Sequence, residues 1–188
     1  RATKISGSGF YFLKGNLAML DLVLQRFALD TIIAKGYTPV IPPYMINRKS
    51  YEEVTDLADF EKVMYKIEDD DAYLIATAEH PMAAMYQDEI FEEKDLPLKM
   101  VGVSPCFRRE IGAHGLDSRG LFRVHQFTKI EQFIYCMPED SWKYHEELLA
   151  NAEEIFTKLE LPYHVVNICT GDIGTVAAKK YDIEAFKH

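Results

Sequence analysis

The chain has 188 residues, of which 48% are hydrophobic and 12% aromatic, a composition typical of one globular domain and not of a disordered segment. A net charge of −9 argues against indiscriminate binding to nucleic acid. Three cysteines without a CxxC spacing argue against a disulfide framework or a thiolate zinc site and fit a reducing, cytoplasmic location, and the absence of a long apolar run predicts no membrane span.

In the first half of the chain, Asn16 is a candidate helix N-cap and Gly36 stands where a glycine commonly ends a helix. Apolar residues between these two positions recur at helical spacing, and they face either an internal core or an interface. The elements predicted here are a strand over residues 10–13, a helix over 17–34, a strand over 37–41, a hairpin of 63–67 with 73–76, and a helix over 79–91.

The second half predicts a strand over 98–108, a polar loop over 111–120, a strand over 121–136, a helix over 138–159 and a strand over 163–168. Strands that are joined mainly by hairpins and separated from the helices predict an α+β fold, with an antiparallel β-sheet flanked by helices. No glycine-rich phosphate-binding motif occurs, so any phosphate would have to be held by side chains. We find no repeat or linker and predict one domain over residues 1–188.

The arginines are concentrated in one part of this acidic chain. Four of the seven lie within sixteen residues, namely Arg108, Arg109, Arg119 and Arg123. Such a cluster in an acidic protein suggests a local anionic ligand, a nucleotide rather than a long polyanion. By strand alternation, Arg109 points away from the face that carries Arg108.

Two predicted strands carry chemically active side chains on one face each. Because side chains alternate along a strand, Arg108 shares a face with Glu110, and Arg123 shares a face with Phe127 and Glu131. If the strands form a hairpin, both sets meet on one surface. Guanidinium groups match phosphate oxygens, an aromatic ring stacks on a purine, and carboxylates accept from amino groups, so the surface suits a nucleotide joined to an amino acid. The alternative is a solvated sheet face.

These segments resemble a known family. Residues 107–110 and 119–131, separated by a variable loop, resemble motif 2 of class II aminoacyl-tRNA synthetases. Their sequence is close to that of the seryl-tRNA synthetases in particular. Residues 36–43 and the helix before them resemble motif 1, which builds the dimer interface in that family. Residues 77–79 (TAE) resemble its serine-binding segment. The resemblance runs almost end to end, so residues 1–188 are expected to be a partial catalytic domain, with motif 1 at about 17–43 and motif 2 at about 101–133.

The resemblance implies a serine–tRNA ligase that uses ATP and Mg²⁺ to form seryl-adenylate and then transfers serine to tRNA(Ser). It also implies a homodimer through motif 1 and a contact of the 111–120 loop with the tRNA acceptor end. The residues implied to bind ATP are Arg108, Arg109, Glu110, Arg123, Val124 and Phe127. The residues implied to bind serine are Thr77, Ala78, Glu79, Arg108 and Glu131. The implied catalytic residues are Arg108, Glu110 and Arg123.

By the same resemblance, Arg108 contacts the α-phosphate and the serine carboxylate, and Arg123 reaches the γ-phosphate. Glu110 holds the adenine amine, Phe127 stacks on the ring, and Glu131 with residues 77–79 receives the amine and hydroxyl of serine. The reaction needs no side-chain nucleophile.

The chain departs from the family because three of the family's features are missing. No arginine follows Arg123, so the arginine of motif 3 is missing, as are the family's metal-binding glutamate and N-terminal tRNA-binding arm. We therefore expect a fragment that lacks its C-terminal part, contains no metal site and by itself activates serine weakly or not at all. One alternative is a synthetase-like nucleotide-binding or regulatory module without catalysis. Another is a carrier-protein ligase, against which the lack of a Cys/His cluster speaks. Of six scattered histidines, His125 is a candidate neighbour of the site.

Overall fold

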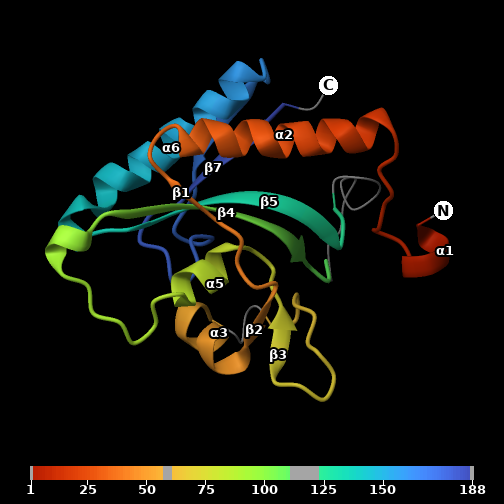
Figure 1. The fold of residues 1–188 in the computed structure, drawn as a ribbon, viewed down its shortest axis with the longest axis horizontal. Helices are drawn as coiled ribbons and strands as arrows, with labels where there is room; N and C mark the ends of the chain where they lie inside the picture. The colour runs from red at the N-terminus through yellow and green to blue at the C-terminus, as the bar shows by residue number, and fades with distance from the viewer. Residues whose placement is uncertain (1, 57–60, 111–122, 187–188) are drawn as a thin grey trace. The chain divides into compact units, whose positions relative to one another are not determined.

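The computed structural model describes residues 2–56, 61–110 and 123–186 and shows a mixed α+β chain, as the sequence predicts (Figure 1). Contacts divide the chain into two compact units, one of residues 1–90 and 100–133 and the other of 91–99 and 134–188. In the described residues, no helix combines the length and apolar character required to cross a bilayer.

The first unit contains a three-stranded sheet in the order β1-β4-β5 and a two-stranded antiparallel sheet of β2 and β3. β1 pairs with β4 in parallel, which the antiparallel prediction did not include; the long connection between them allows the chain to return to the same end of the sheet. Figure 1 shows α2 on one side of β4 and β5, with α3, α5, β2 and β3 on the other. The elements of this unit are α1 (Thr3–Ser6), α2 (Asn16–Ile33), β1 (Thr38–Val40), β2 (Met45–Asn47), α3 (Arg48–Val54), β3 (Ala72–Leu74), α5 (Glu79–Ala84), and most of β4 (Leu98–Phe107) and β5 (Gln126–Tyr135).

The ends of α2 match the sequence pattern only at the C-terminus. Gly36, with φ of +89°, donates its backbone N–H to Ile33 O at 2.9 Å and ends the helix in a conformation that favours glycine. At the other end, Asn16 is the first helical residue and Gly15 takes the cap position without a side-chain hydrogen bond, so the predicted asparagine cap is wrong.

Three further local predictions are wrong or incomplete. Residues 10–13 form no strand; the neighbouring Gly9 O accepts a single hydrogen bond, from the His125 backbone N–H at 2.9 Å. The predicted 63–67 and 73–76 hairpin is reduced to a single bridge between Lys66 and Tyr73, since β3 pairs with β2 instead. The helix expected over 79–91 ends at Ala84.

The core of this unit supports the segment that follows β3. It consists of the buried residues Ile46, Tyr51, Met64, Tyr73, Ile75 and Ala76. Beyond the core, the Phe107 N–H donates to Ile75 O at 2.9 Å, which joins the end of β4 to this segment. Gly102 on β4 allows α5 to approach closely, because a Cβ at this position would lie 2.8 Å from Met82 Sδ and 3.2 Å from Ala78 Cβ. Residues 75–79 are therefore held against β4.

The second unit contains the ends of β4 and β5 and a separate antiparallel pair, β6 and β7, in which Tyr163 lies opposite Ala185. The helix and strand predicted over 138–159 and 163–168 are confirmed, whereas β7 was not predicted. Its elements are η1 (Glu93–Asp95), η3 (Pro138–Asp140), α6 (Ser141–Lys158), β6 (Tyr163–Asn167) and β7 (Tyr181–Ala185).

Candidate active site

Arg108 and Phe127 meet where β4 ends and β5 begins. The Arg108 Cζ lies 5.2 Å from the centre of the Phe127 ring, and the Arg108 Nε donates to Ala76 O at 3.2 Å. A cation over an aromatic face is attracted by the ring's quadrupole, and the carbonyl fixes one edge of the guanidinium. The guanidinium is thus held beside a flat ring, and within the described residues no hydrogen bond of its terminal nitrogens is seen that would compete with a ligand.

Thr77 is the hydrogen-bonding centre of the neighbouring group of residues. Its buried hydroxyl donates to Glu131 Oε2 at 2.9 Å and accepts from the Glu79 backbone N–H at 3.1 Å and from Lys129 Nζ at 3.0 Å. A hydroxyl has one proton and two lone pairs, so these three contacts use its full capacity. Lys129 Nζ also forms an ion pair with Glu131 Oε2.

Two carboxylates and two cations share this region. The pKa of Glu79 is raised above its ordinary value, mainly by partial desolvation and then by the negative charge of Glu131, while Lys129 and Arg108 act in the opposite direction. Glu79 is nevertheless exposed, so solvent reaches its carboxyl group. The four charges sum to zero.

Glu110 and Arg123 form an ion pair, and they are close in sequence to Arg108 and Phe127, respectively. Arg123 Nη1 donates to Glu110 Oε2 at 2.9 Å. The strand-alternation argument does not hold for either residue, because β4 ends at Phe107, Glu110 has a φ of +48° and Arg123 precedes β5. The pair therefore forms through loop geometry, and the structure describes no bond between it and the group around Thr77.

The remaining predicted residues are placed as follows. Arg109 is exposed, and its backbone N–H donates to Val63 O at 2.7 Å. Val124 is half-buried just before β5, and Ala78 is fully buried. The 111–120 loop, with Arg119 and its expected tRNA contact, lies outside the described residues.

Lys129 is the most important residue that the sequence analysis missed. It lies between Phe127 and Glu131 at the two-residue spacing of one strand face, which is a signal that could have identified it.

His125 and His80 were also not assigned to their contacts. Nδ1 of His125 donates to Arg108 O at 2.9 Å and lies 2.9 Å from the Tyr65 hydroxyl. His80, directly after Glu79, is buried with its Nδ1 2.6 Å from the Tyr51 hydroxyl. Burial, with Lys129 and Arg108 as further causes, lowers the pKa of His80 to about 4, so the ring is neutral near pH 7.

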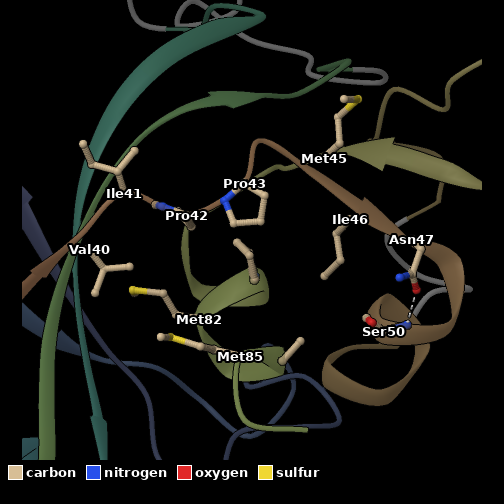
Figure 2. Close-up of a pocket in the computed structure, with 12 residues that line it drawn as sticks. Val40, Ile41, Pro42, Pro43, Met45, Ile46, Asn47, Ser50, Met82 and Met85 are labelled. Atoms are coloured by element: carbon tan, nitrogen blue, oxygen red, sulfur yellow. Dashed lines mark hydrogen bonds between the residues drawn. The ribbon is translucent and has the colours of Figure 1, made fainter.

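A cavity of about 410 Å³ is lined mainly by apolar side chains, and none of the charged residues described above is among its lining residues. Figure 2 shows Met82 of α5 and Met85, directly after α5, on one side, and Pro43 of the connection between β1 and β2 with Ile46 of β2 on the other. Its lining lacks the acidic and basic groups a charged substrate needs, so the candidate site is the group around Arg108 and Thr77. In the described residues, no cluster of three or more His, Cys, Asp or Glu side chains could hold a metal ion.

The comparisons with known proteins agree with this geometry. The chain is 91% identical to a serine–tRNA ligase of Methanocorpusculum labreanum over 186 residues, which are 99% of the chain and 44% of that protein. Its fold matches a crystal structure of seryl-tRNA synthetase from Pyrococcus horikoshii complexed with ATP, with a TM-score of 0.94 and 62% identity over 98% of this chain and 41% of that one. A second match is a cytoplasmic serine–tRNA ligase from Naegleria fowleri in complex with AMP, with a TM-score of 0.93 and 43% identity over 98% and 44% of the two chains.

The chain thus spans less than half the length of the relatives it matches. The family described as the tRNA synthetase class II core domain (G, H, P, S and T) matches residues 63–188, about two thirds of the chain. The chain belongs to this class II tRNA synthetase core-domain family.

Proposed function

We propose that the protein carrying this chain is a serine–tRNA ligase, which activates serine with ATP as seryl-adenylate and transfers it to tRNA(Ser). The observation that carries the proposal is the convergence of Arg108 and Phe127 with the hydrogen-bonded group around Thr77. An adenylate joins a purine, a phosphate and an amino acid, and these residues offer an aromatic plate, a guanidinium and carboxylates. The names of close relatives and the ATP and AMP complexes of two of them support the same function.

In this proposal Arg108 stabilises negative charge on the α-phosphate while the serine carboxylate attacks it in line. Its neighbour Phe127 provides the stacking surface for adenine. Glu110 and Arg123, which bind each other in this structure, separate so that the carboxylate accepts from the adenine amine and the guanidinium reaches the γ-phosphate. Arg109 and the Val124 backbone lie at the edge of the nucleotide.

The serine pocket of the proposal is formed by Thr77, Ala78, Glu79 and Glu131. Because the Thr77 hydroxyl already makes three hydrogen bonds, it orients Glu131 and the Glu79 backbone instead of binding serine directly. The carboxylates then receive the amine and hydroxyl of serine.

Magnesium supplies charge neutralisation on the phosphates in this proposal. The described residues contain no carboxylate or histidine cluster that fits it, so no step is assigned to a magnesium site of the chain.

Two partners belong to the proposal. The acceptor end of tRNA(Ser) contacts the loop over 111–120, and a second copy of the protein covers α2. The second partner is supported by the exposure of apolar side chains along this helix, among them Leu17 (54%), Leu20 (52%) and Val23 (57%). Such a face on one helix is typical of an interface.

The proposal is tested by calorimetry with a non-hydrolysable seryl-adenylate analogue on the natural protein that carries this chain. Replacing Arg108 by Ala removes charge-assisted hydrogen bonds to the phosphate and carboxylate, and affinity is expected to fall roughly 100-fold. The control is Lys158→Ala, because Lys158 is a half-exposed cation on α6 that pairs with Glu154 and lies outside both the site and α2, and the affinity of this variant should stay within about twofold of the natural protein.

Equal binding by the natural protein and Arg108→Ala, or no binding by the natural protein, contradicts the proposal. Serine-dependent ATP–pyrophosphate exchange separates the ligase from a non-catalytic nucleotide-binding module. The module would bind the nucleotide without catalysing the exchange.

A further inference from the structure

Lys129 contacts two of the residues proposed to bind serine, Thr77 and Glu131. It lies on β5 between Phe127 and Glu131, and its Nζ contacts both the Thr77 hydroxyl and the Glu131 carboxylate. About one third of the Lys129 side chain and 18% of the Glu131 side chain are exposed, so the pair is partly shielded from solvent and screened less than a surface ion pair.

The contacts of Glu131 leave one of its two carboxylate oxygens for a ligand. In the part of the chain that the structure describes, Thr77 and Lys129 both bind Oε2. A carboxylate accepts through two oxygens, so Oε1 is the atom that a substrate ammonium group can approach. Lys129 would then stay beside the bound ligand, and its positive charge would act on that ligand.

The charge balance of the pocket depends on this lysine. Arg108 and Lys129 offset the carboxylates of Glu79 and Glu131, because Lys129 pairs directly with Glu131 and Glu79 lies within electrostatic reach of the other three groups. An uncharged pocket suits a ligand without net charge, such as a zwitterionic amino acid. Without Lys129 the pocket would carry one negative charge and would favour a cation.

Resting on the function proposed above, we propose that Lys129 is a specificity-determining residue that makes the pocket select a zwitterionic amino acid over a cationic amine. The lysine does so by neutralising Glu79 and Glu131. A unit charge about 6 Å from the ligand, at the effective dielectric constant of a partly buried site, changes the relative affinity for a cation by roughly tenfold or more.

The experiment compares serine, a zwitterion, with serinamide, which keeps the side chain and the ammonium group but lacks the carboxylate charge. Both are titrated by calorimetry at pH 6.5, where the α-amino group is protonated. The quantity measured is the ratio of the serinamide affinity to the serine affinity in the natural protein. Lys129→Met, which keeps the length but not the charge, should raise this ratio roughly tenfold, and Lys129→Arg should leave it near the natural value.

A second variant makes the test independent of how well Lys129→Met folds. Glu79→Gln gives the pocket a net positive charge and should lower the same ratio by a similar factor, and the double variant with Lys129→Met should restore it. If Lys129→Met weakens both ligands equally, or if Glu79→Gln leaves the ratio unchanged, the lysine does not select by charge and the proposal is wrong.

Failure of the proposed function gives a different result. In that case the natural protein binds neither serine nor the seryl-adenylate analogue, whatever residue stands at position 129. If the natural protein binds the analogue and the ratio does not respond to charge, only the role of Lys129 is rejected.

Discussion

At the scale of single residues, His125 fixes the backbone on which Arg108 depends. The Arg108 N–H donates to His125 O, and Nδ1 of His125 donates to Arg108 O, so the two residues are joined through both backbone groups of the arginine. The His125 ring also stacks on Phe10 with 5.1 Å between ring centres, and the His125 backbone N–H donates to Gly9 O. A Cβ at Gly9 would lie 2.5 Å from this ring, which explains the glycine. His125 is therefore a positioning residue.

Two amide substitutions test this role of His125. The amide nitrogen of Asn matches Nδ1 and can still donate to Arg108 O, whereas that of Gln matches Nε2 and cannot. Because one hydrogen bond is worth about 1 kcal/mol, His125→Gln should weaken binding of the seryl-adenylate analogue roughly fivefold, and His125→Asn should remain close to the natural protein. Equal losses in both variants would show that the ring's packing, and not its Nδ1 proton, is what matters.

At the scale of elements, α5 contributes one residue to the candidate site and another to the core. Its first turn holds Glu79 at the candidate site and His80 in the core, where His80 contacts the buried Tyr51. The rings of Tyr51 and His80 lie 4.7 Å apart, and burial raises the pKa of Tyr51. Both groups are thus uncharged near neutral pH, and Tyr51 belongs to the same buried cluster as Ile75 and Ala76.

The neutral state of His80 predicts a dependence of stability on pH. The pKa of His80 is about 4 in the folded protein and 6.5 in an unfolded chain, so the unfolded state binds more protons between these values. The free energy of unfolding should therefore fall as the pH is lowered from 6.5 towards 4, by about 3 kcal/mol in total, and this contribution should be constant above pH 6.5.

Thermal unfolding of the natural protein and of His80→Gln at pH 5 and pH 7 measures this effect. The glutamine does not titrate, so the natural protein should lose more stability than the variant between the two values. The comparison removes the contributions of other groups such as Glu79, which both proteins share. Parallel losses would mean that His80 is protonated without cost in the folded state.

At the scale of the whole molecule, the described residues leave the apolar face of α2 exposed to solvent. Only Ile32 of this helix is buried, so the described residues do not enclose the stripe in an internal core, and a second subunit remains the proposed cover. Burying several leucine side chains stabilises an interface by about 1.5–3 kcal/mol each.

Sedimentation analysis of the natural protein and of Leu20→Asp tests this interface. A charge buried without a partner is costly, so the variant should dissociate at concentrations where the natural protein is a dimer. Ile90→Asp is the matched control, because Ile90 is an aliphatic residue with 98% exposure that lies outside α2, and it should leave the dimer intact. A natural protein that is monomeric, or equal dissociation of both variants, would contradict the proposal.

The long regular elements and the motif residues were predictable from sequence, and the short elements were not. α2, β4 and α6 were found because an apolar period over ten or more residues outweighs local exceptions. β2 and β3 have three residues each, too few for a period, and their pairing depends on a core formed with α3. Alternation placed Phe127 and Glu131 correctly but failed for Glu110 and Arg123, which lie outside the strands.

The sequence by itself determined the α+β class, the family resemblance and the identity of the residues that meet beside β4 and β5. The tertiary structure decided which of those residues bind one another. It added Lys129 to Thr77 and Glu131, paired Glu110 with Arg123, and buried His80 against Tyr51. The physical reason is that periodicity reports which face of an element a side chain occupies, whereas hydrogen bonds and charge balance depend on segments distant in the sequence coming within about 3 Å.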